Sequence, residues 1–202
     1  MIIKPAEADP REVYHHLVHC VVPRPIGWIS TRGADGHHNV APYSFFQVVG
    51  AKPATVIFAS TVTRHGENKD TLLNARETGE FCVNIVSHDV AEMMNKTAAS
   101  LERGVSEFEH AGIETEPCKS MGALRVKAAH VHFECKLHQE VQLGEGPMST
   151  TVASGLIQLM EIDDALLDEN GMVDPHKLAA VGRMGGNTYC NATDTFELDR
   201  PS

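Results

Sequence analysis

Two cations flank the predicted start of a short helix. Asp70 is a suitable N-cap, the residues after it repeat with a helical period, and Gly79 suits the position just past the helix. Free backbone N–H groups, the helix dipole and the side chains of Arg64, Lys69 and Thr71 would together favour a bound phosphate. A capped helix with solvated charges explains the same spacing equally well. The spacing alone therefore leaves both interpretations open.

Residues 23–46 combine polar groups and aromatic side chains in a pattern that suits a planar ligand. Residues 26–29 predict a buried strand, and Asp35 with Gly36 predicts a hairpin turn after it. Pro42 has no backbone N–H, so we expect the returning strand to break its hydrogen-bond ladder there. Polar donors beside flat apolar surface would suit a planar ligand with polar edges. The residues around the expected break are Asn39, Tyr43, Ser44, Phe45 and Phe46.

The chain has twelve histidines, and some of them are spaced as metal ligands could be. The candidates are the i,i+4 pairs His15–His19 and His16–Cys20 in a predicted helix, and His130, His132 and His138 on the polar face of a predicted strand. No nearby carboxylate or further ligand completes either set. We therefore expect no metal site. A surface helix, and a strand face that is solvated or lies at a subunit interface, account for these residues.

Several well-known catalytic motifs are missing. The sequence has no GxGxxG after a strand, no GxxxxGK[ST], no HExxH and no GxSxG. A dinucleotide would therefore not be held by a Rossmann fold, and hydrolytic chemistry has no positive support.

The predicted elements favour a mainly antiparallel β-barrel with flanking helices over a doubly wound sheet. Strands are expected at 26–29, 55–61, 80–86, 130–143 and 150–162. Short helices are expected at 9–20 with Asp9 as N-cap, at 70–79, after Ser87, at 106–112 and at 174–181. No repeat or linker interrupts the chain, so residues 1–202 are interpreted as one domain.

The composition limits the classes of partner. A formal charge of −10 argues against a nucleic-acid surface, which needs clustered Lys and Arg. No apolar run approaches the ~20 residues of a membrane span, and the N-terminus lacks a signal-peptide pattern. Five cysteines without CxxC spacing indicate reduced thiols, so we expect a cytoplasmic protein.

Taken in order, five segments resemble the flavin reductase-like family, whose members have the FMN-binding split-barrel fold. The segments are 23–31 (PRPIGWIST), 39–46 (NVAPYSFF), 69–79 (KDTLLNARETG), 81–85 (FCVNI) and 182–189 (GRMGGNTY). The resemblance runs from about residue 20 to the C-terminus. It is more specific for the fold and for flavin binding than for the reaction.

The resemblance implies a homodimer with FMN near the subunit interface, and it assigns site residues by motif. The FMN phosphate and ribityl chain would be held by Ser60, Thr61, Arg64, Lys69, Asp70 and Thr71. The edge of the isoalloxazine ring would meet Asn39, Ala41, Pro42, Ser44, Phe45 and Phe46. Pro25, Ile26, Gly27 and Trp28 would lie near the ring, and Arg183 and Tyr189 would close the site. FAD would also fit if its adenosine half extended into solvent.

The expected function is an NAD(P)H-dependent flavin reductase in which hydride passes from nicotinamide to flavin. Such a site needs no dedicated nucleophile, which agrees with the missing catalytic motifs. The reduced flavin could supply a monooxygenase or stay bound. The alternatives are a non-catalytic FMN-binding protein or electron carrier, and a metal-binding or structural dimer based on the histidines.

Overall fold

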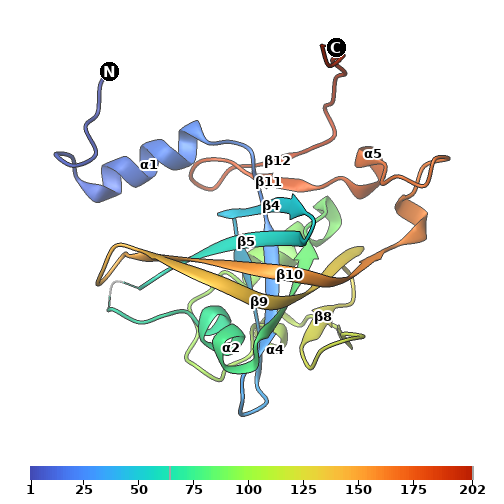
Figure 1. Cartoon of the computed structure of the whole chain (residues 1–202), viewed down its shortest axis with the longest axis horizontal. Helices are drawn as coiled ribbons and strands as arrows, with labels where there is room; N and C mark the ends of the chain where they lie inside the picture. The colour runs from blue at the N-terminus through green and yellow to red at the C-terminus, as the bar shows by residue number, and fades with distance from the viewer. Residues whose placement is uncertain (64, 202) are drawn as a thin grey trace.

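The computed structural model of the protein describes residues 1–63 and 65–201 (Figure 1). Its main feature is an antiparallel seven-stranded sheet with the order β3-β2-β6-β9-β10-β5-β4. The strands are β2 (Gly27–Arg32), β3 (His38–Tyr43), β4 (Phe46–Ala51), β5 (Ala54–Thr61), β6 (Glu80–Ile85), β9 (Val131–Leu143) and β10 (Thr150–Ile162). The mainly β fold is confirmed, and the four strands predicted after residue 50 form within one residue of their expected bounds.

The sheet curls around an aromatic core. Tyr43 on β3 packs edge-on against Phe58 on β5, with ring centroids 5.1 Å apart, and Phe58 packs against Phe81 on β6 at 5.2 Å. Phe46 on β4 fills the space above Gly27 on β2, where an added Cβ would lie 2.6 Å from the Phe46 ring. These contacts join strands from both ends of the sheet order, which gives the sheet its barrel shape.

The expected break of the ladder at Pro42 is wrong. β3 pairs with β2 over its full length, and Pro42 lies opposite Trp28. Because β3 is an edge strand, a proline is tolerated there when the position of its missing N–H faces away from the neighbouring strand. The chain leaves the sheet after Tyr43, at the bend formed by Ser44 and Phe45. The irregular backbone therefore begins two residues later than expected.

Short helices pack against one face of this sheet. They are α2 (Asp70–Thr78), α3 (Ala91–Lys96), which follows a 3-10 turn at His88–Val90, and α4 (Glu107–Ala111). Lys69, not Asp70, is the N-cap of α2, and Gly79 ends that helix at a φ of 76° as expected. A second core cluster forms between α3, α4 and the sheet, and it includes Trp28, Val40, Met94 and Phe108.

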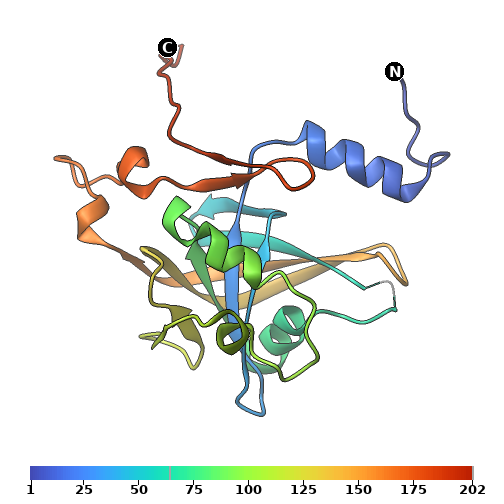
Figure 2. The same ribbon diagram turned by 180° about the vertical axis from the view of Figure 1, so that it is seen from behind.

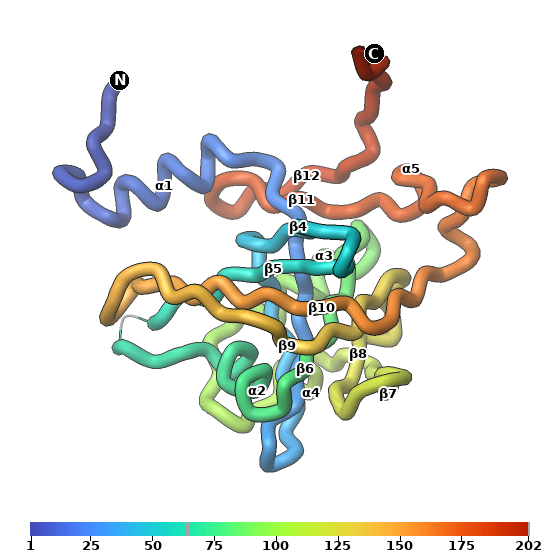
Figure 3. Tube along the Cα trace, viewed as in Figure 1, coloured from blue at the N-terminus to red at the C-terminus, as the bar shows by residue number. Residues whose placement is uncertain are grey.

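A separate layer carries both ends of the chain (Figures 1 and 2). It contains α1 (Pro10–Cys20), capped by Asp9 as predicted, and a small sheet of β1 (Arg24–Pro25), β11 (Val181–Arg183) and β12 (Tyr189–Asn191). The helix expected to run to residue 181 is shorter, because α5 (Pro175–Leu178) ends at Ala179 and β11 follows. The tube in Figure 3 shows α1 beside the connection between β11 and β12.

One half of β9 is buried on the face predicted to be solvated. His132 is 4% exposed and Glu134 is fully buried, because the hairpin of β7 (Thr115–Pro117) and β8 (Leu124–Val126) covers that face. The backbone N–H groups of Lys119 and Ser120 both donate to the Glu134 carboxylate at 2.7 Å. Burial lowers the pKa of His132 to about 4, so its ring is neutral at pH 7.

The described residues show neither a cluster of metal ligands nor a helix that could span a membrane. No group of three or more His, Cys, Asp or Glu side chains is placed to hold a metal ion. No helix within residues 1–63 and 65–201 is long and apolar enough to cross a membrane.

Candidate functional site

The N-terminus of α2 faces a cavity of about 280 Å³, which we call the α2 cavity. No side chain caps this helix end, and Leu72 N–H already donates to the carbonyl of Lys69, so the available N–H groups are those of Asp70 and Thr71, both of which line the cavity. The Lys69 ammonium lies 5.5 Å from the centroid of the Tyr43 ring, and partial burial lowers the pKa of Lys69. The α2 cavity is lined by Asn39, Ala41, Pro42, Tyr43, Thr63, Glu67, Asn68, Lys69, Asp70, Thr71, Thr97, Ala98, Ala99, Ser100, Leu101, Arg103 and Glu107.

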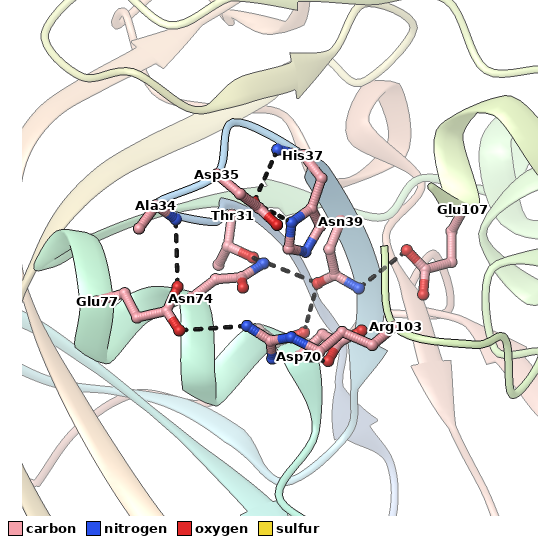
Figure 4. Close-up of polar contacts among 11 residues, drawn as sticks. Thr31, Ala34, Asp35, His37, Asn39, Asp70, Asn74, Glu77, Arg103 and Glu107 are labelled. Atoms are coloured by element: carbon pink, nitrogen blue, oxygen red, sulfur yellow. Dashed lines mark hydrogen bonds and ion pairs between the residues drawn. The ribbon is translucent and has the colours of Figure 1, made fainter. Parts of the chain in front are cut away.

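A buried polar network behind the α2 cavity fixes Asn39 and Thr71 (Figure 4). Asn39 Oδ1 accepts hydrogen bonds from Thr71 Oγ1 at 2.8 Å and Thr31 Oγ1 at 3.3 Å, while Asn39 Nδ2 donates to Glu107 Oε2 at 2.9 Å. Asn74 Nδ2 donates to Thr31 Oγ1 at 3.1 Å. This network joins β2, β3, α2 and α4, so the cavity floor is rigid before any ligand binds.

Two hydroxyl groups near this network have no hydrogen-bond partner in the part of the chain that the structure describes. Tyr43 Oη and Ser60 Oγ are buried and unpartnered. Burial raises the pKa of Tyr43 to about 12, so its phenol keeps its proton at pH 7. An unpartnered buried hydroxyl is unfavourable and is common where a ligand completes the site. Tyr43 lines the α2 cavity, whereas Ser60 lies on β5 behind it.

Charge at the mouth of the α2 cavity is partly balanced within the protein. Arg103 pairs with Asp70 and with Glu77, each at 3.2 Å (Figure 4). Because Asp70 is the first residue of α2, its unpaired carboxylate would oppose an anion at the helix start. Arg103 removes most of this opposition. Burial raises the pKa of Glu107, which favours its neutral form beside the same cavity.

A second cavity of about 380 Å³ adjoins the first, and Pro42 and Ala98 line both. We call it the arginine cavity, because Arg24 and Arg183 stand in its wall. It is lined by Tyr14, His15, Val18, Arg24, Ile26, Pro42, Ser44, Met94, Ala98, Arg183, Met184, Gly186, Asn187 and Tyr189. Helix α1 forms one side and the β11–β12 connection another. We refer to the two neighbouring cavities together as the cleft; Lys69 lines one of them, and Arg24 and Arg183 line the other.

The structure brings many of the predicted site residues to this cleft. Those that line it are Ile26, Asn39, Ala41, Pro42, Ser44, Lys69, Asp70, Thr71, Arg183 and Tyr189. Ser60 is buried, and Thr61 bonds Thr150 across β5 and β10. Arg64 lies outside the described residues.

Other predicted residues near the ring lie elsewhere. Gly27 and Trp28 are buried in β2, and Trp28 Nε1 donates to Thr97 Oγ1 at 2.9 Å, so the indole supports the cavity wall without reaching the cleft. Pro25 and Phe46 line a separate apolar hollow near β11. Phe45 is 41% exposed and packs against Tyr14 of α1. A face of Trp28 stacked on a ligand is therefore excluded by its burial.

Sequence reasoning missed three groups in the cleft. Arg24 stands inside the quoted segment 23–31 but was not identified as a cavity residue. The loop 97–103 and Glu107 reach the α2 cavity only because α3 and α4 fold back over β3. No local pattern in the sequence marks the contacts of loop 97–103 and Glu107. For Arg24 the one local signal is its position between two prolines in a mostly apolar segment.

Comparison with known proteins decides the family. The profile of the flavin reductase like domain matches residues 18–176. The chain belongs to the flavin reductase-like family. This match covers most of the chain and every residue that lines the α2 cavity, whereas seven of the fourteen residues that line the arginine cavity lie outside the matched range.

Solved structures agree with this assignment. Nitrilotriacetate monooxygenase component B from Bacillus cereus is 30% identical, with 98% of each chain covered and a TM-score of 0.93. The 2-nitrobenzoate 2-nitroreductase NbaA of Pseudomonas fluorescens is 28% identical, with 100% of this chain and 97% of that chain covered and a TM-score of 0.89. A split-barrel protein from Shewanella frigidimarina NCIMB 400, 22% identical with 97% and 96% covered and a TM-score of 0.83, is similar in fold. The split-barrel fold and a flavin-related role are thus supported together.

Proposed function

We propose that this protein is an FMN-dependent oxidoreductase that accepts hydride from NADH or NADPH. The observation that carries the proposal is the uncapped N-terminus of α2, beside Lys69, in a cavity that continues into a second, partly apolar one. A helix start with a neighbouring cation suits a phosphate, and the adjoining cavity suits a planar ring. One cleft therefore provides for both ends of FMN.

Each part of the cleft has a role in this proposal. The first-turn N–H groups of α2, Lys69 and Thr71 bind the phosphate, while Tyr43 Oη and Asn39 meet the ribityl chain. Pro42 and Ser44, at the junction, meet the ring edge. FMN would supply the hydride chemistry when bound, so the chain needs only to orient the ring and limit the access of water. FAD is accommodated if its adenosine half leaves the cleft toward solvent.

The acceptor of the electrons has two candidates. Similarity to nitrilotriacetate monooxygenase component B favours transfer of reduced flavin to a monooxygenase partner. Similarity to 2-nitrobenzoate 2-nitroreductase favours reduction of a small organic acceptor on the bound flavin. We also propose that the protein is a cytoplasmic homodimer and that residues 1–202 form a single domain. A flavin carrier without efficient turnover is the competing function.

The test is a visible spectrum of the protein after FMN has been added and excess removed by desalting. NADH or NADPH is then added without oxygen, and bleaching of the flavin band is followed. Retained flavin that bleaches quickly is the expected result. Retained flavin that stays oxidised with both donors would favour the carrier function. No retained flavin and no steady-state turnover with free FMN would refute the proposal.

A further inference from the structure

Arg24 and Arg183 lie directly opposite each other in the antiparallel pair of β1 and β11. Directly opposite residues project from the same sheet face with Cβ atoms about 5 Å apart, and like charges in this position repel. Both side chains line the arginine cavity. Burial, and then the charge of Arg183, lowers the pKa of Arg24. The fold therefore places two positive charges together at one wall of the cleft.

Within residues 1–63 and 65–201, no carboxylate pairs with either of these two guanidinium groups. Arg24 donates to the carbonyl oxygens of Val18 at 2.6 Å, Val21 at 2.9 Å and Met184 at 2.9 Å. Arg183 donates to the carbonyl of Gly186 and to the Tyr189 hydroxyl. Buried charges in proteins are normally paired with an opposite charge. Their other contacts are also uncharged, because the Arg24 guanidinium lies 6.0 Å from the centroid of the Phe45 ring and that of Arg183 lies 4.4 Å from the centroid of the Tyr189 ring. In a chain of net charge −10, two neighbouring arginines held by neutral oxygens and aromatic rings suggest an external counter-ion.

Arg24 also has a donor without an acceptor. Its side chain is only 6% exposed, and its Nε is buried and unpartnered. Part of the cavity wall is apolar, because Val18, Ile26 and Met94 lie buried beside it. An anionic group next to an apolar or aromatic body would satisfy both the charges and the walls.

We propose that Arg24 and Arg183 form an anion-binding site for the molecule that exchanges electrons with the flavin. The site is separate from the phosphate position at α2, which lies in the adjoining cavity. Its ligand is the carboxylate of a small aromatic acceptor or the pyrophosphate of a nicotinamide dinucleotide, since both present the same charge to a guanidinium group. The claim that this anion is a second substrate rests on the proposed function. The existence of the anion site does not depend on it.

The test compares benzoate with benzamide, which has the same ring without the charge. Isothermal titration of the full chain without FMN should show benzoate binding about tenfold more tightly than benzamide, as expected for a charge-assisted contact. Arg183→Gln should abolish this preference. Arg11→Gln, which removes the same charge from the exposed side of α1, should retain it. Equal binding of benzoate and benzamide by the unaltered protein would overturn the site even if Arg183→Gln failed to fold.

Titration with FMN separates this inference from the proposed function. Arg183→Gln should weaken FMN binding by no more than about threefold, because only the uncharged ring of FMN would reach the cavity that Arg183 lines. Lys69→Ala should keep the benzoate preference, because the two cations act on different anions. If Arg183→Gln lost as much FMN affinity as Lys69→Ala, the arginine cavity would hold the flavin phosphate and the inference would be wrong. Failure of every variant to bind FMN would instead refute the proposed function.

ADP-ribose identifies the source of the anion. Competition between ADP-ribose and benzoate would assign the site to the dinucleotide pyrophosphate. Simultaneous binding of the two would assign it to the carboxylate of a small acceptor. Either result supports an anion site between the two arginines. A preference for benzoate that persists in Arg183→Gln would show that the two arginines do not form such a site.

Discussion

Both ends of the cleft carry cations, but the protein holds them in opposite ways. Lys69 precedes α2 and is exposed over much of its surface, although its ammonium is partly shielded beside the Tyr43 ring. Its side chain makes no hydrogen bond to the described residues. Arg24 is buried and bonds three carbonyl oxygens, which ties α1 to the β11–β12 connection. Lys69 is therefore available to a ligand, whereas Arg24 also holds α1 and the β11–β12 connection together.

This difference shows how a charge can be kept where no acid balances it. A flexible lysine in water costs little, and its position can follow the ligand. A buried guanidinium needs fixed acceptors, and main-chain carbonyls provide them without cancelling the positive charge. At the arginine end the main-chain carbonyls accept hydrogen bonds from Arg24 but do not neutralise its charge, so the charge can still attract an anion.

The largest expected effect is on stability at the arginine end. Arg24→Met removes a donor to three carbonyls and should lower the free energy of unfolding by about 3 kcal/mol, since hydrogen bonds to charged groups are the strong ones. Lys69→Met should change the same quantity by less than about 0.5 kcal/mol. Urea denaturation of both variants measures this. Similar losses of unfolding free energy in the two variants would show that Arg24 and Lys69 do not differ in their structural role.

A smaller effect is expected on ligand affinity at the α2 end. Lys69→Ala should weaken FMN binding by about 1–3 kcal/mol, as expected for a lost charge-assisted contact to phosphate. Lys52→Ala, which removes an exposed charge from the turn between β4 and β5, is the matched control and should bind FMN normally. Fluorescence titration of FMN measures both. Unchanged affinity in Lys69→Ala would reject the phosphate position.

The same contrast explains which part of the site could be predicted from the sequence. The α2 end depends on signals within about ten residues: an N-cap position, a helical period and Gly79 in the left-handed conformation. The strands β9 and β10 were predictable for the same reason, because alternation is a local pattern. Local patterns therefore set these elements and the helix start at the α2 end of the cleft.

The arginine end could not be predicted, because its contacts join distant parts of the chain. Arg24 meets the carbonyl of Met184, 160 residues later, and pairs in register with Arg183. His132 alternates as a solvated residue would, yet the β7–β8 hairpin covers it. Pro42 suggested a broken ladder, but only the sheet order reveals that β3 is an edge. In each case tertiary contacts, not local preference, decided the outcome.

The smallest expected effect concerns the acid at the α2 end. Burial raises the pKa of Glu107, so the folded protein binds that proton more tightly than the unfolded chain does. Stability contributed by this group is therefore present at low pH and lost as pH rises through the interval between the unfolded pKa and the raised folded pKa. Glu107→Gln can still accept from Asn39 Nδ2 and the Val40 N–H, but it does not titrate.

Relative to Glu107→Gln, the unaltered protein should lose stability as pH rises across that interval, by an amount proportional to the size of the pKa shift. Urea denaturation at a series of pH values measures the difference, and Glu109→Gln on the exposed side of α4 should run parallel to the unaltered protein. If Glu107→Gln also ran parallel, Glu107 would be ionised in the folded state. Three carboxylates, those of Glu67, Asp70 and Glu107, would then line the cavity, and of these only Asp70 pairs with Arg103, so the α2 end would be a poorer phosphate site than the arginine end.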